Sequence, residues 1–265
     1  MTTFQKVIKY SAIALAVFLI VGIVVGIINI IGLFGDDAVN EDVTVYEVPS
    51  DIKRLEIEIN AADFTIKQGE KFFVESNLKH LTVKDKNGVL TVKETKKLSS
   101  TTYKNAVLIL YVPAETVFEK ADITTGAGRL TVDKLSADKV NFEFGAGEVK
   151  IDNLVANSNI NIEAGAGEIT ISNGSLRNLD LEMGVGQLNL TSALIGESDL
   201  ELGIGQSNIT VLGNKDDYRL DIEKGIGNIT VDGESVSNFE NSGNRTNRID
   251  ISGGIGEIKL SFKEK

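Results

Sequence analysis

The chain has 265 residues, no cysteine, a single histidine and a formal net charge of -11. Without cysteine it cannot form a disulfide bond, a thiolate metal site or a cysteine nucleophile. The acidic balance argues against nucleic-acid binding, which requires an excess of lysine and arginine. A hydrophobic content of 42% and only two prolines indicate a folded protein rather than a disordered one.

Residues 10–34 are predicted to form a transmembrane helix. No side chain between Lys9 and Asp36 carries a formal charge. A helix of this length extends about 37 Å at ~1.5 Å per residue, which exceeds the ~30 Å hydrocarbon core of a bilayer. The apolar part of a cleaved signal peptide spans only ~7–15 residues. We therefore interpret this segment as an uncleaved, single-pass anchor.

The charges beside the anchor predict its orientation. Two lysines precede the apolar run, and four acidic residues follow it before position 43. By the positive-inside rule, residues 1–9 would be cytoplasmic and residues 35–265 would lie outside the plasma membrane. Gly22 and Gly26 form a GxxxG pair that could bring two helices together as a homodimer, although glycine is also common in membrane helices that do not associate.

Residues 35–45 are expected to be an acidic stalk, and residues 46–118 an N-terminal β-region. Asn87-Gly88 separates two alternating runs in this region, which predicts a hairpin because both turn positions require a positive φ angle. The segment 107–112 is apolar on both faces and should be an interior strand. His80 is expected to be a surface residue.

Lysines are concentrated in one part of this region. From Lys67 to Lys104 there are nine lysines and four acidic residues, whereas the chain from residue 105 onward has 14 basic and 25 acidic residues. Such a basic cluster can attract anionic lipid headgroups or wall polymers. It can equally be an ordinary solvated hairpin, and both interpretations stay open.

A Gly-x-Gly triplet recurs seven times within residues 119–265. The first glycines of the triplets are Gly126, Gly145, Gly165, Gly184, Gly203, Gly225 and Gly254, at steps of 19, 20, 19, 19, 22 and 29 residues. Inward positions are two apart along a strand, but each triplet inserts one extra residue, as a bulged corner does. We expect each unit to be two short strands joined at a glycine corner, with residues 57–66 as a degenerate copy.

A unit of ~19 residues cannot bury its apolar side alone, so successive units should stack directly over one another. The predicted fold class is all-β, as a parallel β-solenoid of ~19–20-residue repeats with equivalent positions ~4.8 Å apart. An antiparallel β-sandwich of hairpins is the alternative.

At its GAG, GVG and GIG triplets the chain resembles a bacterial family of β-strand-repeat proteins described as candidate adhesins, a domain of unknown function. The resemblance covers about residues 45–265 and includes LEIEINAADFTI, VLILYVP and GIGEIKL. It implies that membrane-anchored members occur in the Gram-positive envelope, sometimes encoded beside envelope-stress signalling systems. No catalytic residues are attributed to the family, so the resemblance implies none here.

Two columns of acidic residues are expected on the exposed side of the repeat strands, because side chains two apart share a face. Such columns are by default a solvated surface, since carboxylates ~4.8 Å apart in water repel by only ~0.9 kcal/mol before salt screening. The sharper alternative is a strip that binds Ca²⁺ or Mg²⁺ weakly through oxygen ligands. Its candidate ligands are Asp180, Glu182, Asp199, Glu201, Asp221 and Glu223. No enclosed metal site and no cofactor are expected, because a dinucleotide site would need its glycines to open a helix.

The two longest steps contain insertions, at residues 214–219 and 233–248. Insertions in solenoids often cluster on one binding face. The candidates for partner contact are Arg219, Phe239, Arg245 and Arg248.

The leading functional hypothesis is a membrane-anchored, extracellular binding or scaffold protein of a bacterial cell envelope, with envelope polymers or membrane proteins as partners. The alternative is an accessory component of envelope-stress signalling. A third is a glycan-cleaving enzyme of the β-helix type, which would need a cleft with paired carboxylates that the regular columns do not provide. We expect no enzymatic activity.

Overall fold

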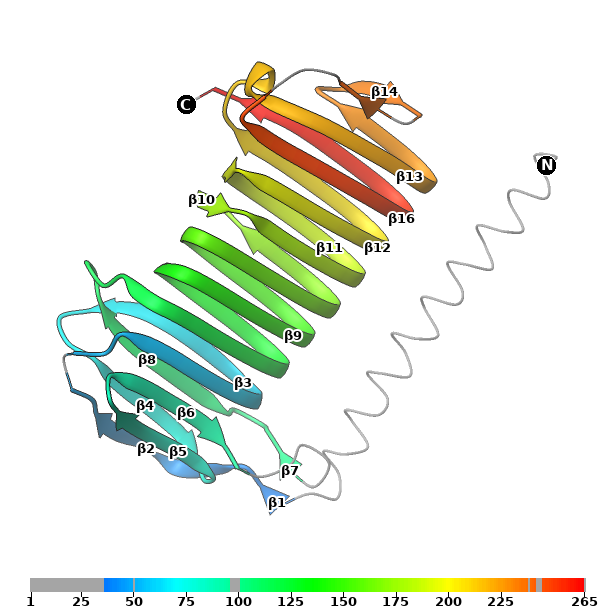
Figure 1. Cartoon of the computed structure of the whole chain (residues 1–265). Coiled ribbons are helices and arrows are strands. Elements are labelled where there is room, and N and C mark those ends of the chain that lie inside the picture. Colours follow the sequence, from blue (N-terminus) through cyan, green and yellow to red (C-terminus); the bar gives the residue numbers. More distant parts are fainter. Residues whose placement is uncertain (1–35, 50, 96–100, 238, 242–244, 265) are drawn as a thin grey trace.

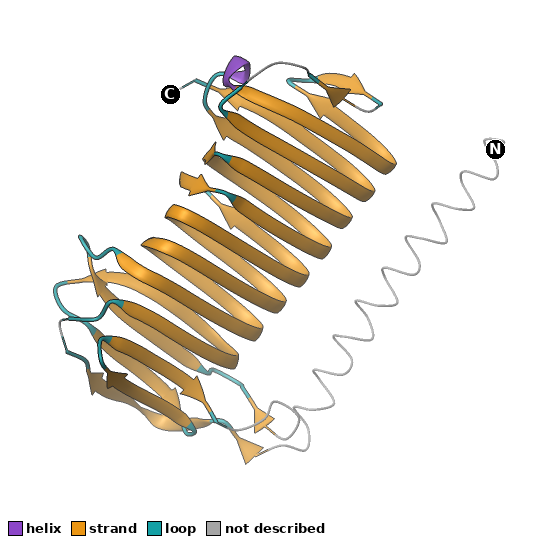
Figure 2. Cartoon of the chain, in the orientation of Figure 1, coloured by secondary structure: helices purple, strands orange, loops and turns teal. Residues whose placement is uncertain are grey.

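The computed structural model describes residues 36–49, 51–95, 101–237, 239–241 and 245–264, and this part of the protein is all-β. Figure 2 shows strands and loops with one short 3₁₀ turn, η2 (Lys215–Asp217). In the described residues, one mixed sheet contains 14 strands, and two further strands form a separate pair. The strands are β1 (Asp36–Asp37), β2 (Val39–Glu47), β3 (Arg54–Gly69), β4 (Phe73–Leu78), β5 (Leu81–Lys86), β6 (Val89–Glu94), β7 (Thr101–Thr102), β8 (Val107–Pro113), β9 (Phe118–Ile171), β10 (Gly174–Arg177), β11 (Leu179–Ile195), β12 (Glu197–Leu212), β13 (Tyr218–Val231), β14 (Glu234–Val236), β15 (Phe239–Glu240) and β16 (Asn247–Lys263).

The repeats pair in parallel, with like positions side by side. Gly186 of β11 lies opposite Gly167 of β9 on one side and opposite Gly205 of β12 on the other. Each coil enters its Gly-x-Gly corner along one arm and leaves along a second arm, and the coils form the stack seen in Figure 1. We call the surface built by the arms before the corners the first face, and the surface built by the arms after the corners the second face.

The glycine corners bring neighbouring coils into backbone contact. At Gly205, φ is +149° and a Cβ atom would lie 1.7 Å from the carbonyl oxygen of Gly186 in the adjacent coil. At Gly203, a Cβ atom would lie 2.1 Å from the carbonyl oxygen of Gly184. No side chain fits at these distances, so glycine is required by the close approach of the backbones as well as by the bend.

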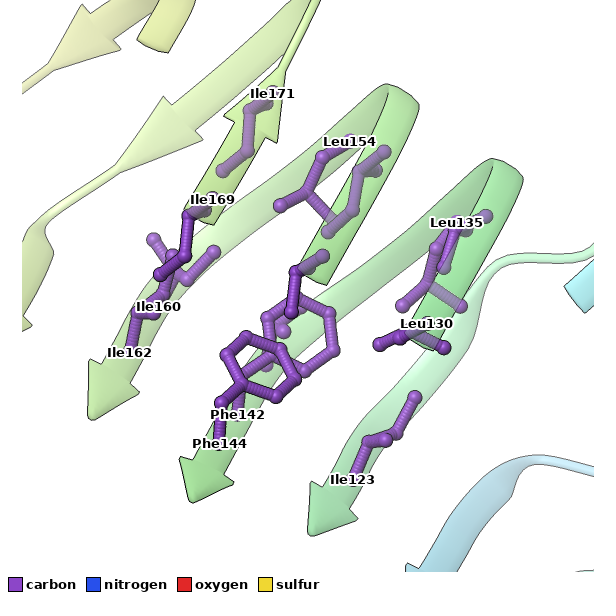
Figure 3. Packing of buried hydrophobic residues seen from close by; sticks show 14 of the residues in the cluster. Ile123, Leu130, Leu135, Phe142, Phe144, Leu154, Ile160, Ile162, Ile169 and Ile171 are labelled. Carbon is purple, nitrogen blue, oxygen red and sulfur yellow. The ribbon is translucent and has the colours of Figure 1, made fainter. Parts of the chain in front are cut away.

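Apolar side chains of the two arms meet between the faces. Figure 3 shows Ile123 and Phe142 from the first arms together with Leu130 and Ile169 from the second arms, and all four are buried. The strands alternate because one side of each arm faces this core and the other faces water. Leu135, in the short segment that leads to the next coil, is buried as well. The core is therefore continuous along the stack.

The last two coils do not stack in chain order, and here the expectation of successive coils lying directly over one another is wrong. β16 pairs with β12 on one side and with β13 on the other, so the final coil lies between two coils that precede it in sequence. The antiparallel strands β14 and β15 then pair with β13. The repeat pattern does not reveal this order, because all these coils present matching positions to their neighbours.

Strands before the repeats extend the stack at its other end (Figure 1). β3 is the degenerate copy, and its Ala61 lies opposite Ala127 of β9. The first arm of β3 pairs in parallel with β6, which forms an antiparallel hairpin with β5. The second arm pairs with β8, which is followed by β4 and β2. β8 is therefore an interior strand, as predicted.

Two further expectations for this end can be compared with the structure. The turn at Asn87 and Gly88 has φ angles of 54° and 74°, and the predicted hairpin is confirmed. His80 is exposed, as expected. The predicted stalk at residues 35–45 differs from the structure, because most of this segment belongs to β2. β2 pairs with β4, and its Tyr46 packs against the core.

The predicted anchor at residues 10–34, with Gly22 and Gly26, lies outside the described residues. Among the residues that the structure describes, no helix is long and apolar enough to cross a membrane.

Candidate functional site

Two columns of polar side chains run along the first face, at right angles to the strands. In the inner column, nearer the corners, Glu163 lies opposite Glu182 and Glu182 opposite Glu201. In the outer column, Asp180 lies opposite Asp199. Parallel pairing in register places equivalent side chains directly side by side, about 4.8 Å apart, so the acidic groups cannot avoid one another.

The insertion of β16 changes the neighbours of these columns. Asp250 of β16 lies between Asp199 and Asp221, which makes the outer column continuous. Ser252 of β16 lies next to Glu201 and interrupts the inner column before Glu223. Elsewhere in the outer column an amide relieves the repulsion: the Asn141 amide donates to Asp122 at 2.7 Å.

A shallow trough of about 850 Å³ lies beside the inner column and crosses six consecutive coils. The first glycines of the corners line it, because they carry no side chain. Buried or partly buried apolar side chains border the glycines, and glutamates form the polar side of the trough. The bordering residues are Phe144, Ala164, Met183 and Leu202, and the glutamates are Glu143, Glu163, Glu182 and Glu201, with Thr124 and Ser252 at the two ends.

Asp199 of the outer column has a perturbed carboxyl. Partial burial raises the pKa of Asp199, and the carboxylates of Asp250, Asp180 and Glu201 raise it further. Arg248 opposes the shift of the Asp199 pKa, but its guanidinium is engaged with Asp250 at 2.7 Å. The outer column therefore holds the negative charge of Asp199 at a cost, which a nearby cation would relieve.

The six predicted cation ligands lie on the first face, but they do not form an enclosed site. Asp180 and Asp199 are neighbours, as are Glu182 and Glu201, whereas Asp221 and Glu223 are separated from them by β16. Within the described part of the chain, no three acidic or histidine side chains converge closely enough to hold a metal ion. Ca²⁺ needs six to eight oxygen ligands, which an open ladder does not supply.

The four residues predicted for partner contact lie at the C-terminal end of the stack, and each has an internal neighbour. Arg245 donates to the carbonyl oxygens of Lys215 and Asp216 at 3.2 and 2.9 Å. Arg219 is 3.5 Å from Glu240, and Arg248 pairs with Asp250 as described above. Phe239 packs against the core, with the Lys215 ammonium 5.7 Å from its ring centroid. These contacts join the insertion to the last coils. The role of the four residues in binding a partner stays a prediction.

Sequence reasoning found the acidic columns but missed the trough. The alternation identifies Met183 and Leu202 as inward residues, and both are buried. It does not reveal that their edges border a surface depression, because that depends on the missing side chains of the glycines beside them. The Gly-x-Gly triplet could have indicated the trough, because a column of glycines beside a column of glutamates leaves a depression along the surface.

Fold and site together define an all-β repeat protein with a long, acidic, glycine-lined surface. A family model described as Toastrack DUF4097 matches residues 52–261. The chain belongs to this family of candidate adhesin-like domains, whose function is unknown. A search of curated proteins finds no match.

Solved structures with similarity to the chain include three bacterial proteins. A candidate cell adhesion protein from Clostridium sporogenes is 13% identical, with a TM-score of 0.33, and the match covers 84% of this chain and 99% of that one. A candidate lipid-binding protein from Parabacteroides distasonis is 14% identical, with a TM-score of 0.44 and coverage of 83% and 98%. A candidate adhesin from Bacteroides fragilis is 12% identical, with a TM-score of 0.33 and coverage of 83% and 98%. Superpositions at these TM-scores identify neither a ligand nor a mechanism for this chain.

Proposed function

We propose that the protein is a membrane-anchored, extracellular binding scaffold of the adhesin-like kind in a bacterial cell envelope. Its parallel repeats would form a β-solenoid, and residues 10–34 would tie the solenoid to the plasma membrane with residues 1–9 in the cytoplasm. No reaction is assigned, because the acidic side chains of the first face are regularly spaced along an open surface and the structure places none of them in a closed cleft.

The observation that carries this proposal is the trough. It is open along its length, crosses six coils and presents glutamates at the regular spacing of the strands. Such a surface suits an extended chain that makes similar contacts at each coil, so that many weak contacts add up. Because the wall is acidic, the ligand would carry positive charges, and the exposed glycine backbone would offer it close approach.

Binding of a cationic polymer tests the role of the trough. The purified full-length protein in detergent should bind poly-lysine, and the variant Glu163→Gln, Glu182→Gln, Glu201→Gln should bind it at least about tenfold more weakly. The matched control changes three acidic groups of the second face instead, as Glu148→Gln, Asp152→Asn and Glu168→Gln. Equal weakening by both triple variants would show that net charge, and not the trough, determines binding.

Protease treatment of intact cells tests the membrane topology separately. Residues 36–265 should be removed by an external protease while the short N-terminal segment remains with the membrane. An outer part that stays protected on intact cells and is cut only after lysis would refute the proposed location. A pull-down of the full-length protein from envelope fractions, with and without divalent cations, would then identify the natural ligand.

A further inference from the structure

In the described part of the chain, the N-terminal end of the stack has two strand edges without a partner strand. On the first face the strands run from β3 through β6 to β5, and on the second face from β3 through β8 and β4 to β2. Among the described residues, no strand pairs with the outer edge of β5 or of β2. The other end of the stack differs, because β14 and β15 pair with the outer edge of β13 (Figure 1). A free edge presents unpaired N–H and C=O groups that can pair with another chain.

The two free edges carry opposite charges. β2 contains Glu41, Asp42 and Glu47 and no basic residue, and the exposed Glu47 is ion-paired with Lys71 of its own chain at 3.0 Å. β5 and the turn before it contain three exposed lysines, and in the described part of the chain none of them has an ion-pair partner. These lysines are Lys79, Lys84 and Lys86.

β2 also exposes apolar surface. Val43 and Val45 are 55% and 54% exposed, which is unusual for large apolar side chains on a regular strand. Natural edge strands are normally shortened, twisted or charged in ways that prevent pairing. β2 carries acidic residues and an irregular register between Val39 and Thr44, but its regular part from Thr44 to Glu47 keeps Val45 outward, and this part is suited to a partner strand.

At the N-terminal end of the stack, the second face extends one strand further than the first face. Beyond β3, the first face has two strands and the second face has three. A two-fold axis parallel to the strands would bring the first face of one copy against the second face of the other, so that five strands lie between the two β3 strands on both sides. A two-fold axis that placed like faces together would leave six strands on one side and four on the other, with a gap of about two strand spacings, ~10 Å. The step therefore favours β2 of one copy against β5 of the other.

Direction and register agree with this arrangement. β5 is antiparallel to β6, and β2 is related to β8 by two antiparallel pairings, so both β5 and β2 run away from the glycine corners. A two-fold axis parallel to the strands keeps these directions, and the two edges would pair in parallel, as the coils do. The pairing of β5 with β6 and of β6 with β3 places Lys84 at the same height along the strands as Glu56. The pairing of β2 with β4, of β4 with β8 and of β8 with β3 places Val45 at the same height as Thr65.

We propose that two copies of this chain associate through their N-terminal ends, with β2 of each copy paired to β5 of the other. Val45 lies beside Lys84 of the second copy, Glu47 lies close to its Lys86, and Glu41 and Asp42 lie toward its Lys79. The contact continues both faces of the stack across the junction and covers the exposed valines. It does not depend on the ligand of the trough or on the membrane anchor.

Cysteine cross-linking tests this pairing directly, because the natural chain has no cysteine. Full-length protein with Val45→Cys and Lys84→Cys together should form a disulfide-linked dimer on mild oxidation. Each single variant should remain monomeric on a denaturing gel, and a mixture of the two single variants should give a cross-linked heterodimer. Glu143→Cys with Lys150→Cys, at exposed positions in the centre of the stack, gives the background of random collisions.

Two outcomes of this experiment would overturn the proposal. Cross-linking of Val45→Cys alone would mean that β2 meets β2, which is the arrangement that the step disfavours. Cross-linking of the double variant no faster than the central control would mean that the edges are not in contact. Neither outcome bears on poly-lysine binding or on protease topology, so the proposed function would stand or fall separately.

Charge exchange provides an independent measurement. Lys79→Glu with Lys86→Glu should raise the dimer dissociation constant at least about tenfold, because Glu41, Asp42 and Glu47 of the other copy would then face like charges. Adding Glu41→Lys and Asp42→Lys to that variant should restore much of the association, which a general loss of folding would not allow. Lys139→Glu with Lys150→Glu, on exposed positions of the stack, should leave the dissociation constant within about twofold. A dissociation constant that does not respond to the first variant would contradict the proposal.

Discussion

The centre of the stack and its C-terminal end are built from the same repeat, yet the chain passes through them in different orders. From β9 to β12 each coil lies beside the coil that precedes it in sequence. After β12 the chain passes over one position, forms β13 and the strands β14 and β15, and returns as β16 between β12 and β13. The difference shows that the repeat specifies which positions pair, while the length of the connections decides which coils become neighbours.

The returning coil also gives the end of the stack a cover. An uninterrupted series of coils would leave the last edge open to pairing with other chains. Here the long interval between the last two triplets supplies β14 and β15, which pair with β13 in the antiparallel sense. The insertion thus has a structural role at this end, whereas at the N-terminal end the outer edges of β2 and β5 have no partner strand among the described residues.

The largest expected difference in stability is between a glycine substitution at a repeat corner and one at a turn in the insertion. Gly205→Ala should destabilise the stack by more than about 4 kcal/mol, because the new Cβ atom would meet the Gly186 carbonyl at 1.7 Å. Gly233→Ala should cost only about 1–2 kcal/mol, since Gly233 has a positive φ angle but no atom within 4 Å of an added Cβ. Urea denaturation followed by circular dichroism measures both. Similar losses for the two variants would mean that backbone contact between coils is not what requires glycine.

The next effect compares a central core residue with one in the end cover. Phe142→Ala should destabilise the protein by about 3–4 kcal/mol, because Phe142 is fully buried between the faces and leaves a cavity. Phe239→Ala should cost about 1 kcal/mol, since Phe239 is only half-buried. Hydrogen exchange should show increased exchange throughout β9 and its neighbours for the first variant, and only near β13 and β15 for the second. Exchange that spreads over the whole stack in the Phe239 variant would show that the end is not an independent unit.

Much of the centre of the molecule could be predicted from the sequence. The glycine triplets mark the corners, and the extra residue in each triplet explains why Ala146 and Val149 are three apart although both belong to the same pattern. Asn60 stands where the degenerate copy lacks its first glycine, and its backbone N–H is bound by Glu94 at 3.0 Å. In this region, equivalent positions of the repeat are the positions that pair between coils, so the repeat pattern in the sequence predicts the strand pairing.

The order of the final coils could not be predicted in the same way. Asp221 and Asp250 occupy the same column, and either could lie beside Asp199 without changing any local pattern. Choosing between them requires the geometry of the return path and the antiparallel cover, which depend on contacts far apart in sequence. The trough was missed for a related reason, because a depression is defined by what surrounds the glycines and not by the glycines themselves.

A smaller effect tests how the insertion is attached. Arg245→Ala should destabilise the C-terminal end by about 1–2 kcal/mol, because its half-buried guanidinium donates to the carbonyl oxygens of Lys215, Asp216 and Tyr218. The control Arg129→Ala should cost less than about 0.5 kcal/mol, since its ion pair with Glu148 is exposed to water. Hydrogen exchange of β13 and β16 reports the local loss. If the Arg129 variant is the more destabilised, surface ion pairs between coils contribute more than the attachment of the insertion.

The smallest effect concerns the acidic column that joins the centre to the C-terminal end. Asp199→Asn should stabilise the protein at neutral pH by less than about 1 kcal/mol, because it removes a carboxylate that is partly buried and is repelled by Asp250 and Asp180. The folded-state pKa of Asp199 lies above its ordinary value of 3.8, so the native protein takes up a proton first as the pH falls. The charged Asp199 carboxylate lowers the stability of the natural protein, and this loss is recovered as the pH falls through the folded-state pKa. The stability advantage of Asp199→Asn should therefore vanish below about pH 3.8.

The matched control for this last effect is Asp152→Asn, which removes one negative charge from an exposed position on the second face. If it stabilises the protein as much as Asp199→Asn at every pH, the gain comes from the net charge of -11 and not from the column. Added salt should reduce the gain from Asp199→Asn only in part, because partial burial shields that carboxyl from counter-ions as well as from water. A cationic ligand in the neighbouring trough should have the opposite consequence: by lowering the cost of the charged column, it would make the natural carboxylate preferable to the amide. Measuring stability with and without poly-lysine therefore connects the electrostatics of this column to the proposed binding surface.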